Sequence, residues 1–220
     1  FAPDARASLI EQISARVDYL LESDSVEHRE RAGQIDQLRS AVTSEGKENL
    51  VNRIAYTWFN RISALRFMDA HGFHPAKVRV ITAIEGFTQP EVLQQARSGD
   101  LGDDLDFDRS RLSDVLSGKI PSSDPTNEAY RILLVAACHA LTEIDPELFP
   151  NSLNDAFSEL LLPADLLSEN SVLAPFRNEI TDEDCADVEI LGWLYQFYIS
   201  EKKDEVMASK KAVSANNIPY

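Results

Sequence analysis

The fold of this 220-residue chain is decided by the stretch NLVNRIAYTWFNRISALRFMDAHG, Asn49–Gly72. Its apolar side chains recur at steps of three and four residues, the spacing that lines one face of a helix. They are Val51, Ile54, Ala55, Trp58, Ile62, Leu65 and Met68. Gly72 tolerates a left-handed cap and Pro75 prevents continuation, so we predict a central core helix that ends there. The residues expected largely off the core face are Arg53, Asn60, Arg61 and Asp69.

The same periodicity predicts further helices on both sides of the central one. They cover residues 3–21, a second helix over 26–42, a helix over 90–97, one turn around 112–116 and a second core helix over 127–141. Thr181 opens a capping-box pattern, TDED, ahead of a long final helix that runs through Val188 to Ile199. Residues 77–84, KVRVITAI, favour a short strand or an extended segment against the core.

These elements predict an all-α fold, with one short strand or hairpin as the only addition, arranged as an irregular multi-helix domain. We place this helical domain at residues 1–206 and a linker at residues 207–220, where periodicity is lost. Because the chain begins at Phe1 without a methionine, we also expect it to be part of a longer polypeptide.

Composition restricts the classes of function. The hydrophobic fraction of 44% supports a sizeable core, and the formal net charge of -16 disfavours binding of nucleic acid by the chain as a whole, because an acidic surface repels phosphate. Cys138 and Cys185 are too few for a disulfide framework, which predicts buried thiols in the cytoplasm. No apolar run approaches the about twenty residues that cross a bilayer, so we expect no membrane partner.

Several patterns suggest metal or cofactor chemistry and then fail. The carboxylates of Asp104, Asp106 and Asp108 have the alternate spacing of calcium ligands, but Arg109 and Val115 occupy the positions where an EF-hand needs glycine and glutamate. We therefore predict a solvated acidic loop. His71 with His74, and Cys138 with His139, lack companion pairs at zinc spacing, so we expect no metal site.

No nucleophile elbow, phosphate-binding loop or dinucleotide fingerprint is present, so we expect no catalytic and no cofactor-binding residue in this chain. The terminal tetrapeptide Asn217–Tyr220 is similar to the Asn-Pro-Pro-Tyr motif that binds a flipped adenine, but Ile218 replaces a proline and no nucleotide-binding strand precedes it. The aromatic final helix, with Lys202 and Lys203, is compatible with base stacking; its helical spacing favours the alternative that most of its aromatics are core.

Three segments carry a resemblance to a known family. The segments AYTWFNRISALRFMDAHG (55–72), SELLLP (158–163) and VEILGWLYQFYISEKKDEV (188–206) resemble, in the same order, the N-terminal region of PglX-type adenine-specific DNA methyltransferases of BREX phage-defence systems. The resemblance implies a catalytic domain downstream that binds S-adenosylmethionine and methylates adenine N6. It implies no catalytic residue here, since the family's cofactor and Asn-Pro-Pro-Tyr motifs lie beyond this region.

On this basis we expect a non-catalytic accessory domain. Its implied partners are the catalytic domain in cis, DNA through the full-length protein, and other BREX proteins. Candidate contact residues are Arg53, Arg61, Arg66, Lys202 and Lys203; the equally weighted alternative is that the arginines pair with local acids. The rival function is an acidic protein-binding or DNA-mimicking module that recruits another defence component.

Overall fold

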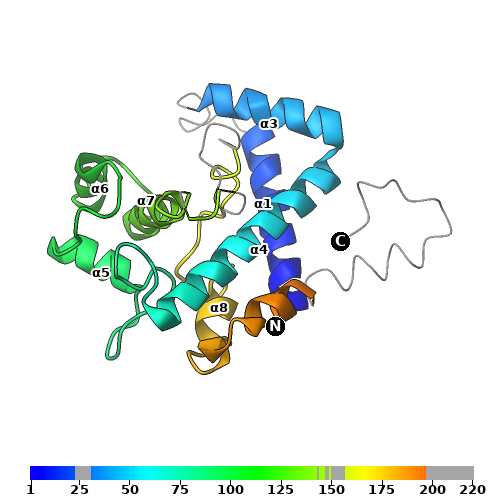
Figure 1. Ribbon diagram of the computed structural model, residues 1–220. Helices are drawn as coiled ribbons and strands as arrows, with labels where there is room; N and C mark the ends of the chain where they lie inside the picture. Colours follow the sequence, from blue (N-terminus) through cyan, green and yellow to red (C-terminus); the bar gives the residue numbers. More distant parts are fainter. Residues whose placement is uncertain (23–30, 143, 147–148, 150–156, 197–220) are drawn as a thin grey trace.

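The computed structural model describes residues 1–22, 31–142, 144–146, 149 and 157–196 (Figure 1). The described residues form helices joined by irregular segments, without any strand, so the predicted all-α class is confirmed. The helices are α1 (Ala2–Glu22), α3 (Ala32–Glu45), α4 (Lys47–His71), α5 (Glu91–Ser98), α6 (Arg109–Leu116), α7 (Pro125–His139) and α8 (Ala174–Asn178), followed by a 3-10 turn, η1 (Asp184–Ala186). Residues 189–196 are also helical.

Helix α4 lies at the centre, as the apolar spacing predicts. It contacts α1, α3, α8 and η1, and the side chains of Trp58, Phe59, Ile62 and Leu65 are completely buried. Burial of this size stabilises the fold by roughly 1.5 to 3 kcal/mol per side chain. Gly72 has a φ of 63° and its N–H donates to the carbonyl of Met68, which confirms the expected left-handed end of the helix.

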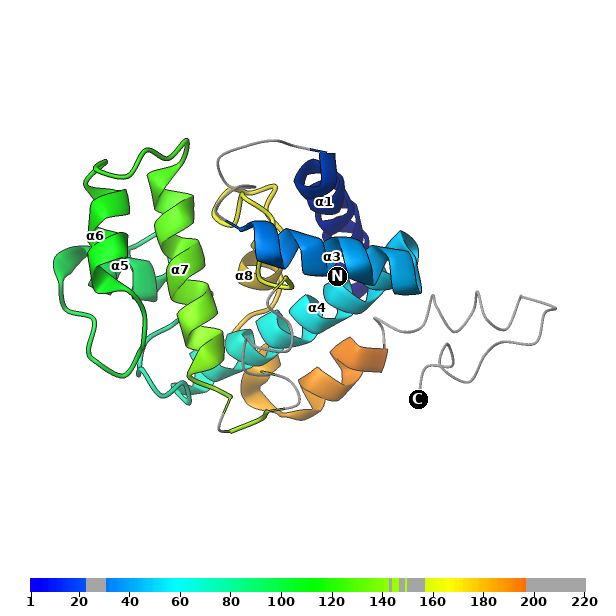
Figure 2. The same cartoon turned by 90° about the horizontal axis from the view of Figure 1, so that it is seen from above.

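The other helices lie on two sides of α4. Figure 2 shows α5, α6 and α7 grouped on one side and α1 with α3 on the other. Side-chain caps begin two of these helices: Asp108 accepts from the N–H of Arg111 at the start of α6, and Asp124 accepts from that of Asn127 at the start of α7. Helix α6 is therefore longer than the single predicted turn, since it begins three residues before Leu112.

A long irregular segment, residues 157–173, completes the core between these groups. Leu160, Leu161, Leu162 and Leu166 are buried in it. Trp58 donates from its ring N–H to the carbonyl of Ser158 at 3.1 Å, which fixes the segment to α4. The leucines of the SELLLP stretch therefore belong to the core.

Near the C-terminal end of the described chain, the capping box forms as predicted. Thr181 and Asp184 exchange hydrogen bonds, with the Thr181 N–H donating to the carboxylate at 2.8 Å and the Asp184 N–H donating to the hydroxyl at 3.1 Å. The box begins only η1, however, and not the final helix. Val188 is 62% exposed and Trp193 is 55% exposed, so the prediction that the aromatics of this helix are mostly core is wrong for Trp193.

The sequence predicted either a short strand or an extended segment for residues 77–84. The structure has no strand there: these residues form an irregular segment against the core, in which Val80 and Ile81 are fully buried. The physical reason is that a side chain of α4, Asp69, takes the N–H groups that a strand would offer to a neighbour. The start of the predicted 26–42 helix and the predicted 207–220 linker lie partly or wholly outside the described residues.

Candidate functional site

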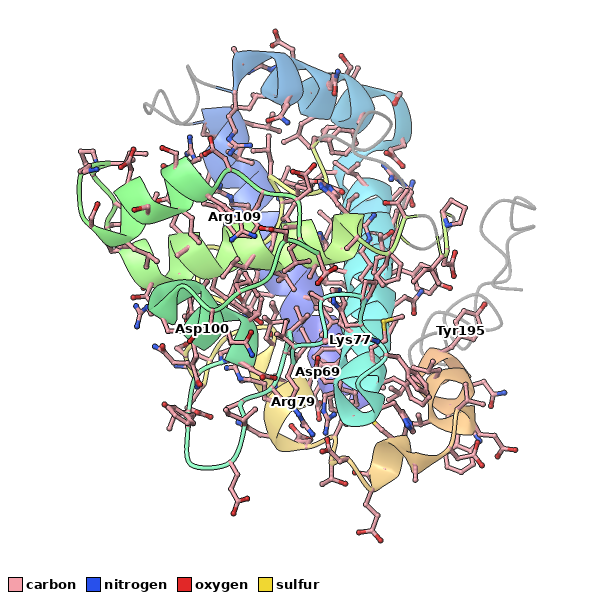
Figure 3. All side chains as sticks on the ribbon, turned by 60° about the vertical axis from the view of Figure 1, so that its left-hand side comes forward. Asp69, Lys77, Arg79, Asp100, Arg109 and Tyr195 are labelled. Carbon is pink, nitrogen blue, oxygen red and sulfur yellow. The ribbon has the colours of Figure 1, made fainter. Side chains whose placement is uncertain are left out.

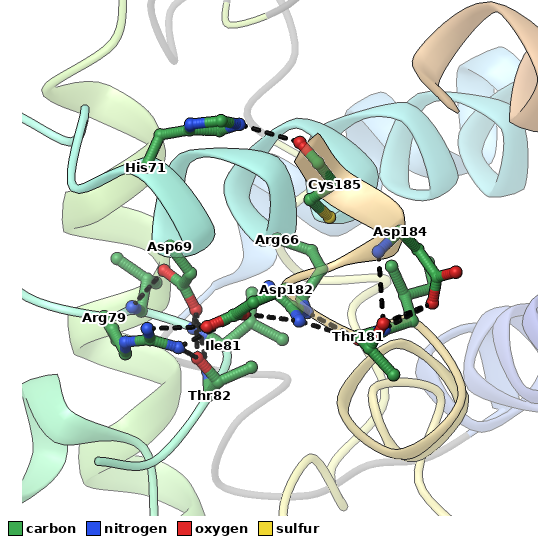
Figure 4. Close-up of polar contacts among 12 residues, drawn as sticks. Arg66, Asp69, His71, Arg79, Ile81, Thr82, Thr181, Asp182, Asp184 and Cys185 are labelled. Carbon is green, nitrogen blue, oxygen red and sulfur yellow. Dashed lines mark hydrogen bonds and ion pairs between the residues drawn. The ribbon is translucent and has the colours of Figure 1, made fainter. Parts of the chain in front are cut away.

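The last turns of α4 carry a buried carboxylate that organises the chain after the helix. Asp69 is 3% exposed and accepts hydrogen bonds from the backbone N–H groups of Val80, Ile81 and Thr82 at 2.7, 2.9 and 2.8 Å. The hydroxyl of Thr82 adds a fourth bond at 3.0 Å (Figure 4). The prediction that Asp69 lies off the core face is therefore wrong, because Asp69 lies inside the protein. Its carboxylate accepts the hydrogen bonds that a neighbouring strand would otherwise accept from residues 80–82.

The electrostatics of Asp69 are set by two opposed effects. Burial raises the pKa of Asp69 to about 6, because removal from water disfavours the charged form, and the four hydrogen bonds act in the opposite direction. At pH 7 the group is a carboxylate with its oxygens occupied by donors. Because it is enclosed and already bonded, Asp69 positions backbone and does not meet a substrate.

An ion cluster next to Asp69 joins the C-terminal segment to the loop after α4. Arg66 donates twice to the carbonyl of Ile180, at 3.0 and 2.7 Å, and pairs with Asp182 at 2.8 Å. Arg79 pairs with the other oxygen of Asp182 at 2.8 Å, and Figure 3 shows Arg79 beside Asp69. The Arg79 guanidinium lowers the pKa of Asp182. The cluster is thus a cross-link between residues 66, 79 and 180–182.

The three arginines predicted as contact residues occupy different environments. Arg61 is 4% exposed, with its guanidinium 5.2 Å from the ring of Trp58, and Arg66 is 3% exposed. The prediction that Arg61 lies off the core face is wrong, and Arg66, predicted as a contact residue, is enclosed as well, because the helix is surrounded on more sides than its apolar stripe indicates. Arg53 is at the surface and pairs with Glu45 at 2.8 Å, the alternative given for it. Lys202 and Lys203 lie outside the described residues.

Other arginines hold irregular segments by donating to backbone carbonyls, a role that the sequence reasoning missed. Arg177 donates to the carbonyls of Leu166, Leu167 and Ser168 at 2.8 to 3.1 Å. Arg131 bonds Leu162 and Pro163, and Arg16 bonds Leu160, in the same way. The guanidinium fork suits such paired acceptors. One feature of the sequence could have indicated this role. Residues 157–173 contain many leucines without helical periodicity, which is typical of a buried loop whose backbone carbonyls need hydrogen-bond donors from side chains.

The histidines and cysteines considered as metal ligands contact protein groups. His74 is 1% exposed, with one ring nitrogen 3.1 Å from the carbonyl of Ala137 and the other accepting from the N–H of Ala76. His71 lies 2.7 Å from the carbonyl of Cys185. His139 lies 2.6 Å from Glu159. Within the described ranges, no three His, Cys, Asp or Glu side chains gather as a metal site would require.

The acidic segment and the cysteines also have structural roles. Of the three alternating aspartates, Asp104, Asp106 and Asp108, the last is the N-cap residue of α6. Burial raises the pKa of Cys138 to about 12, and Cys185 is buried as well, which confirms the prediction of buried thiols.

A hollow of about 470 Å³ lies between α5 and α6. Its apolar lining includes Leu101, Phe107 and Leu112, and Arg97 and Arg109 also line it. Arg97 donates to Gln89 and Thr126, and Arg109 donates to the carbonyls of Leu101 and Gly102, so both guanidinium groups support the walls.

In doubly wound α/β folds, a nucleotide-type cofactor binds at a glycine-rich loop between a strand and a helix. The described residues contain no strand and so do not provide such a loop. None of the helices in the described part of the chain has both the length and the apolar character needed to cross a membrane.

Comparison with known proteins gives two relatives. The chain is 36% identical over 210 residues to the adenine-specific methyltransferase BrxX of Escherichia coli O9:H4 (strain HS), a match that covers 91% of this chain and 17% of that protein. It is 33% identical over 180 residues to the adenine-specific methyltransferase PglX of Lacticaseibacillus casei (strain Zhang), covering 79% of this chain and 14% of that protein. No protein-family model matches the chain.

The chain therefore spans less than one fifth of the length of the curated relatives it matches. The matches cover most of the chain, and the helical structure agrees with the class that the apolar periodicity of the sequence predicts. The chain is homologous to one region of the PglX-type adenine-specific methyltransferases.

Proposed function

We propose that this chain is a non-catalytic helical domain of an adenine-specific DNA methyltransferase of a BREX phage-defence system. It acts in the cytoplasm by docking on the catalytic domain of the same polypeptide, which binds S-adenosylmethionine and methylates adenine N6. The observation that carries the proposal is the 36% identity to BrxX over nearly the whole chain. We place the domain at residues 1–206 and a linker to the catalytic domain at residues 207–220.

Two properties of the structure support assembly as the role of the domain. The buried carboxylate and the ion cluster that α4 carries are occupied by protein donors, so they stabilise a scaffold. Arg66, one of the candidate contact residues, is buried and donates to the carbonyl of Ile180, which argues against a phosphate contact at this residue. The net charge of -16 further favours a protein surface as the partner over DNA.

The test compares the full-length methyltransferase with a variant that lacks residues 1–206. We expect the deletion to lower adenine methylation by about tenfold or more, which corresponds to about 1.4 kcal/mol of activation free energy. Binding of S-adenosylmethionine, followed by calorimetry, is expected to persist in the deletion variant and to be absent from the isolated 220-residue chain. Unchanged methylation, or heat of binding with the isolated chain, would overturn the proposal.

A second part of the proposal is that the domain contacts DNA directly. Because Arg61 and Arg66 are buried, the remaining candidate contact residues are Arg53, Lys202 and Lys203. Charge reversal of the two lysines in the full-length enzyme is expected to weaken methylation more at low salt than at high salt, because the counterion release that accompanies each phosphate contact contributes most at low salt. Arg39→Glu, at an exposed ion pair on α3, is the control. Equal methylation by all variants would remove DNA contact from the proposal.

The net charge favours one alternative function, an acidic module that recruits another defence component or mimics DNA. Such recruitment is driven by charge, so capture of a basic partner by the full-length protein should fall steeply between low and high salt. Capture that does not depend on salt argues against this alternative.

A further inference from the structure

The segment between α4 and α5 leaves the body of the protein as a loop (Figure 1). Its tip is a β-turn in which the N–H of Phe87 donates to the carbonyl of Ile84 at 3.1 Å. Gly86, the third residue of the turn, has a φ of 85°, the conformation that a type II turn requires at this position and that glycine adopts without strain. The turn places Ile84 and Phe87 at its two ends.

Both ends of this loop are fixed to the core. At the entry, Thr82 is bound through its N–H and its hydroxyl to the buried carboxylate of Asp69. At the exit, the N–H of Glu91 donates to the carbonyl of Thr82 at 3.1 Å, and Gln94 donates to the carbonyl of Gln89 at 2.8 Å. The two ends of residues 83–89 are therefore held together, which restricts the loop and lowers the entropy lost when a partner binds.

The tip exposes apolar side chains on this fixed support. Phe87 is 59% exposed and Ile84 is 38% exposed, whereas Val80, Ile81 and Val92 at the base of the loop are completely buried. A large aromatic group held outside the core is typical of the residues that dominate binding at protein interfaces. Within residues 83–89 the one charged residue is Glu85, next to Ile84, whereas Arg79 and Arg97 lie at the base of the loop, where Arg97 donates to Gln89 at 3.2 Å.

We propose that the 83–89 loop is the anchor by which this domain docks, with Ile84 and Phe87 entering an apolar pocket bordered by lysine or arginine on the remainder of the same methyltransferase polypeptide. The inference rests on the proposed function and names its contact surface. The matched relatives are far longer than this chain, so most of their sequence lies outside the region described here. The negative charge of the loop and of the whole domain specifies a basic border for the pocket.

The test is photo-cross-linking in the full-length methyltransferase. Phe87 is replaced by p-benzoylphenylalanine, and the cross-linked peptides are identified by mass spectrometry. The matched control carries the same group at Tyr19, an aromatic residue on α1 that is 46% exposed. We expect position 87 to cross-link to an apolar segment outside residues 1–220 of the same polypeptide, with basic residues within a few positions. We expect position 19 to give no cross-link to that segment.

A second variant tests the same contact without the cross-linker. Ile84→Ser combined with Phe87→Ser in the full-length protein should speed limited proteolysis between the domain and the remainder on the order of tenfold, as loss of an apolar anchor requires. Tyr19→Ser should leave that rate unchanged. Both loop side chains are exposed, so the circular dichroism melt of the domain should also stay unchanged.

Cross-links from position 87 only within residues 1–220, only to DNA or only to a second copy would overturn the assignment, as would the absence of cross-links. These results differ from failure of the proposed function, in which deletion of residues 1–206 leaves methylation intact. If deletion abolishes methylation while position 87 contacts nothing outside the domain, the domain acts through another surface.

Discussion

At the scale of single residues, Asp69 controls the path of the chain where α4 ends. Its carboxylate collects three consecutive backbone N–H groups from a segment whose β-branched residues are typical of a strand. A buried N–H without an acceptor costs about 1 to 3 kcal/mol, so one side chain stabilises a whole turn of irregular backbone. The loop that we assign to docking begins at the last of these bonds.

Substitution of Asp69 is therefore expected to be severe. Asp69→Ala leaves three buried N–H groups without their acceptor, and we expect the free energy of unfolding to fall by about 3 to 5 kcal/mol in urea melts. The control is Asp36→Ala, which removes an exposed ion pair with Arg39 and should change stability by less than about 1 kcal/mol. Similar midpoints for the two variants would show that Asp69 does not hold the segment.

His74 provides a prediction for pH. Burial lowers the pKa of His74 below its ordinary value, and the nearby positive charge of Lys77 acts in the same direction. The unfolded chain therefore binds more protons than the folded protein when the pH drops below about 6.5, and stability falls with pH in that range. We expect urea melts to show a larger loss of stability between pH 7.5 and pH 5.5 for the parent than for His74→Gln. Equal losses would contradict a neutral, buried imidazole.

At the scale of elements, the regular helices and the irregular segments are stabilised in different ways. Helices such as α4 and α7 bury an apolar face and begin or end at local signals, Gly72 in one case and Asp124 with Pro125 in the other. The 157–173 segment has no regular pattern of backbone hydrogen bonds, and arginine side chains donate to several of its carbonyls. Loss of one arginine should therefore loosen a loop while the helices remain intact.

Arg177 tests this dependence. Arg177→Lys keeps the charge but loses the planar fork that binds three carbonyls, since an ammonium group is a compact point donor. We expect amide hydrogen exchange in residues 166–171 to quicken by about tenfold or more, with α4 unaffected. Arg39→Lys, at an exposed pair on α3, serves as the control. If the 166–171 amides exchange as in the parent, the arginine does not hold this segment.

This difference between elements also explains what the sequence can predict. The positions of α4, α5 and α7, the buried Trp58 and the capping box at Thr181 follow from neighbours within a few residues, and they are confirmed. The bonds that place Arg66 and Trp58 join residues 114 and 100 positions apart, and no local pattern indicates them. Arg66 was therefore predicted as a contact residue, although residues 180–182 of the C-terminal segment bind it.

At the scale of the whole molecule, the described residues form a helical body in which buried charged side chains such as Arg66 and Asp69 bind backbone groups. Its exposed apolar groups include Phe87 at the tip of the 83–89 loop and Trp193 near the C-terminal end. If the domain docks on the rest of the methyltransferase as we propose, its acidic surface favours a basic protein surface as the partner. The proposal then requires the domain to stay bound to the remainder of the protein without a covalent connection.

The most direct test is to introduce a site-specific protease sequence within residues 207–220 of the full-length protein, cleave it, and follow the two pieces by gel filtration and by adenine methylation. The account predicts that the pieces elute together and that methylation continues after cleavage. Separation of the two pieces on the column would contradict docking, and separation with methylation undiminished would also contradict any need for the domain in catalysis.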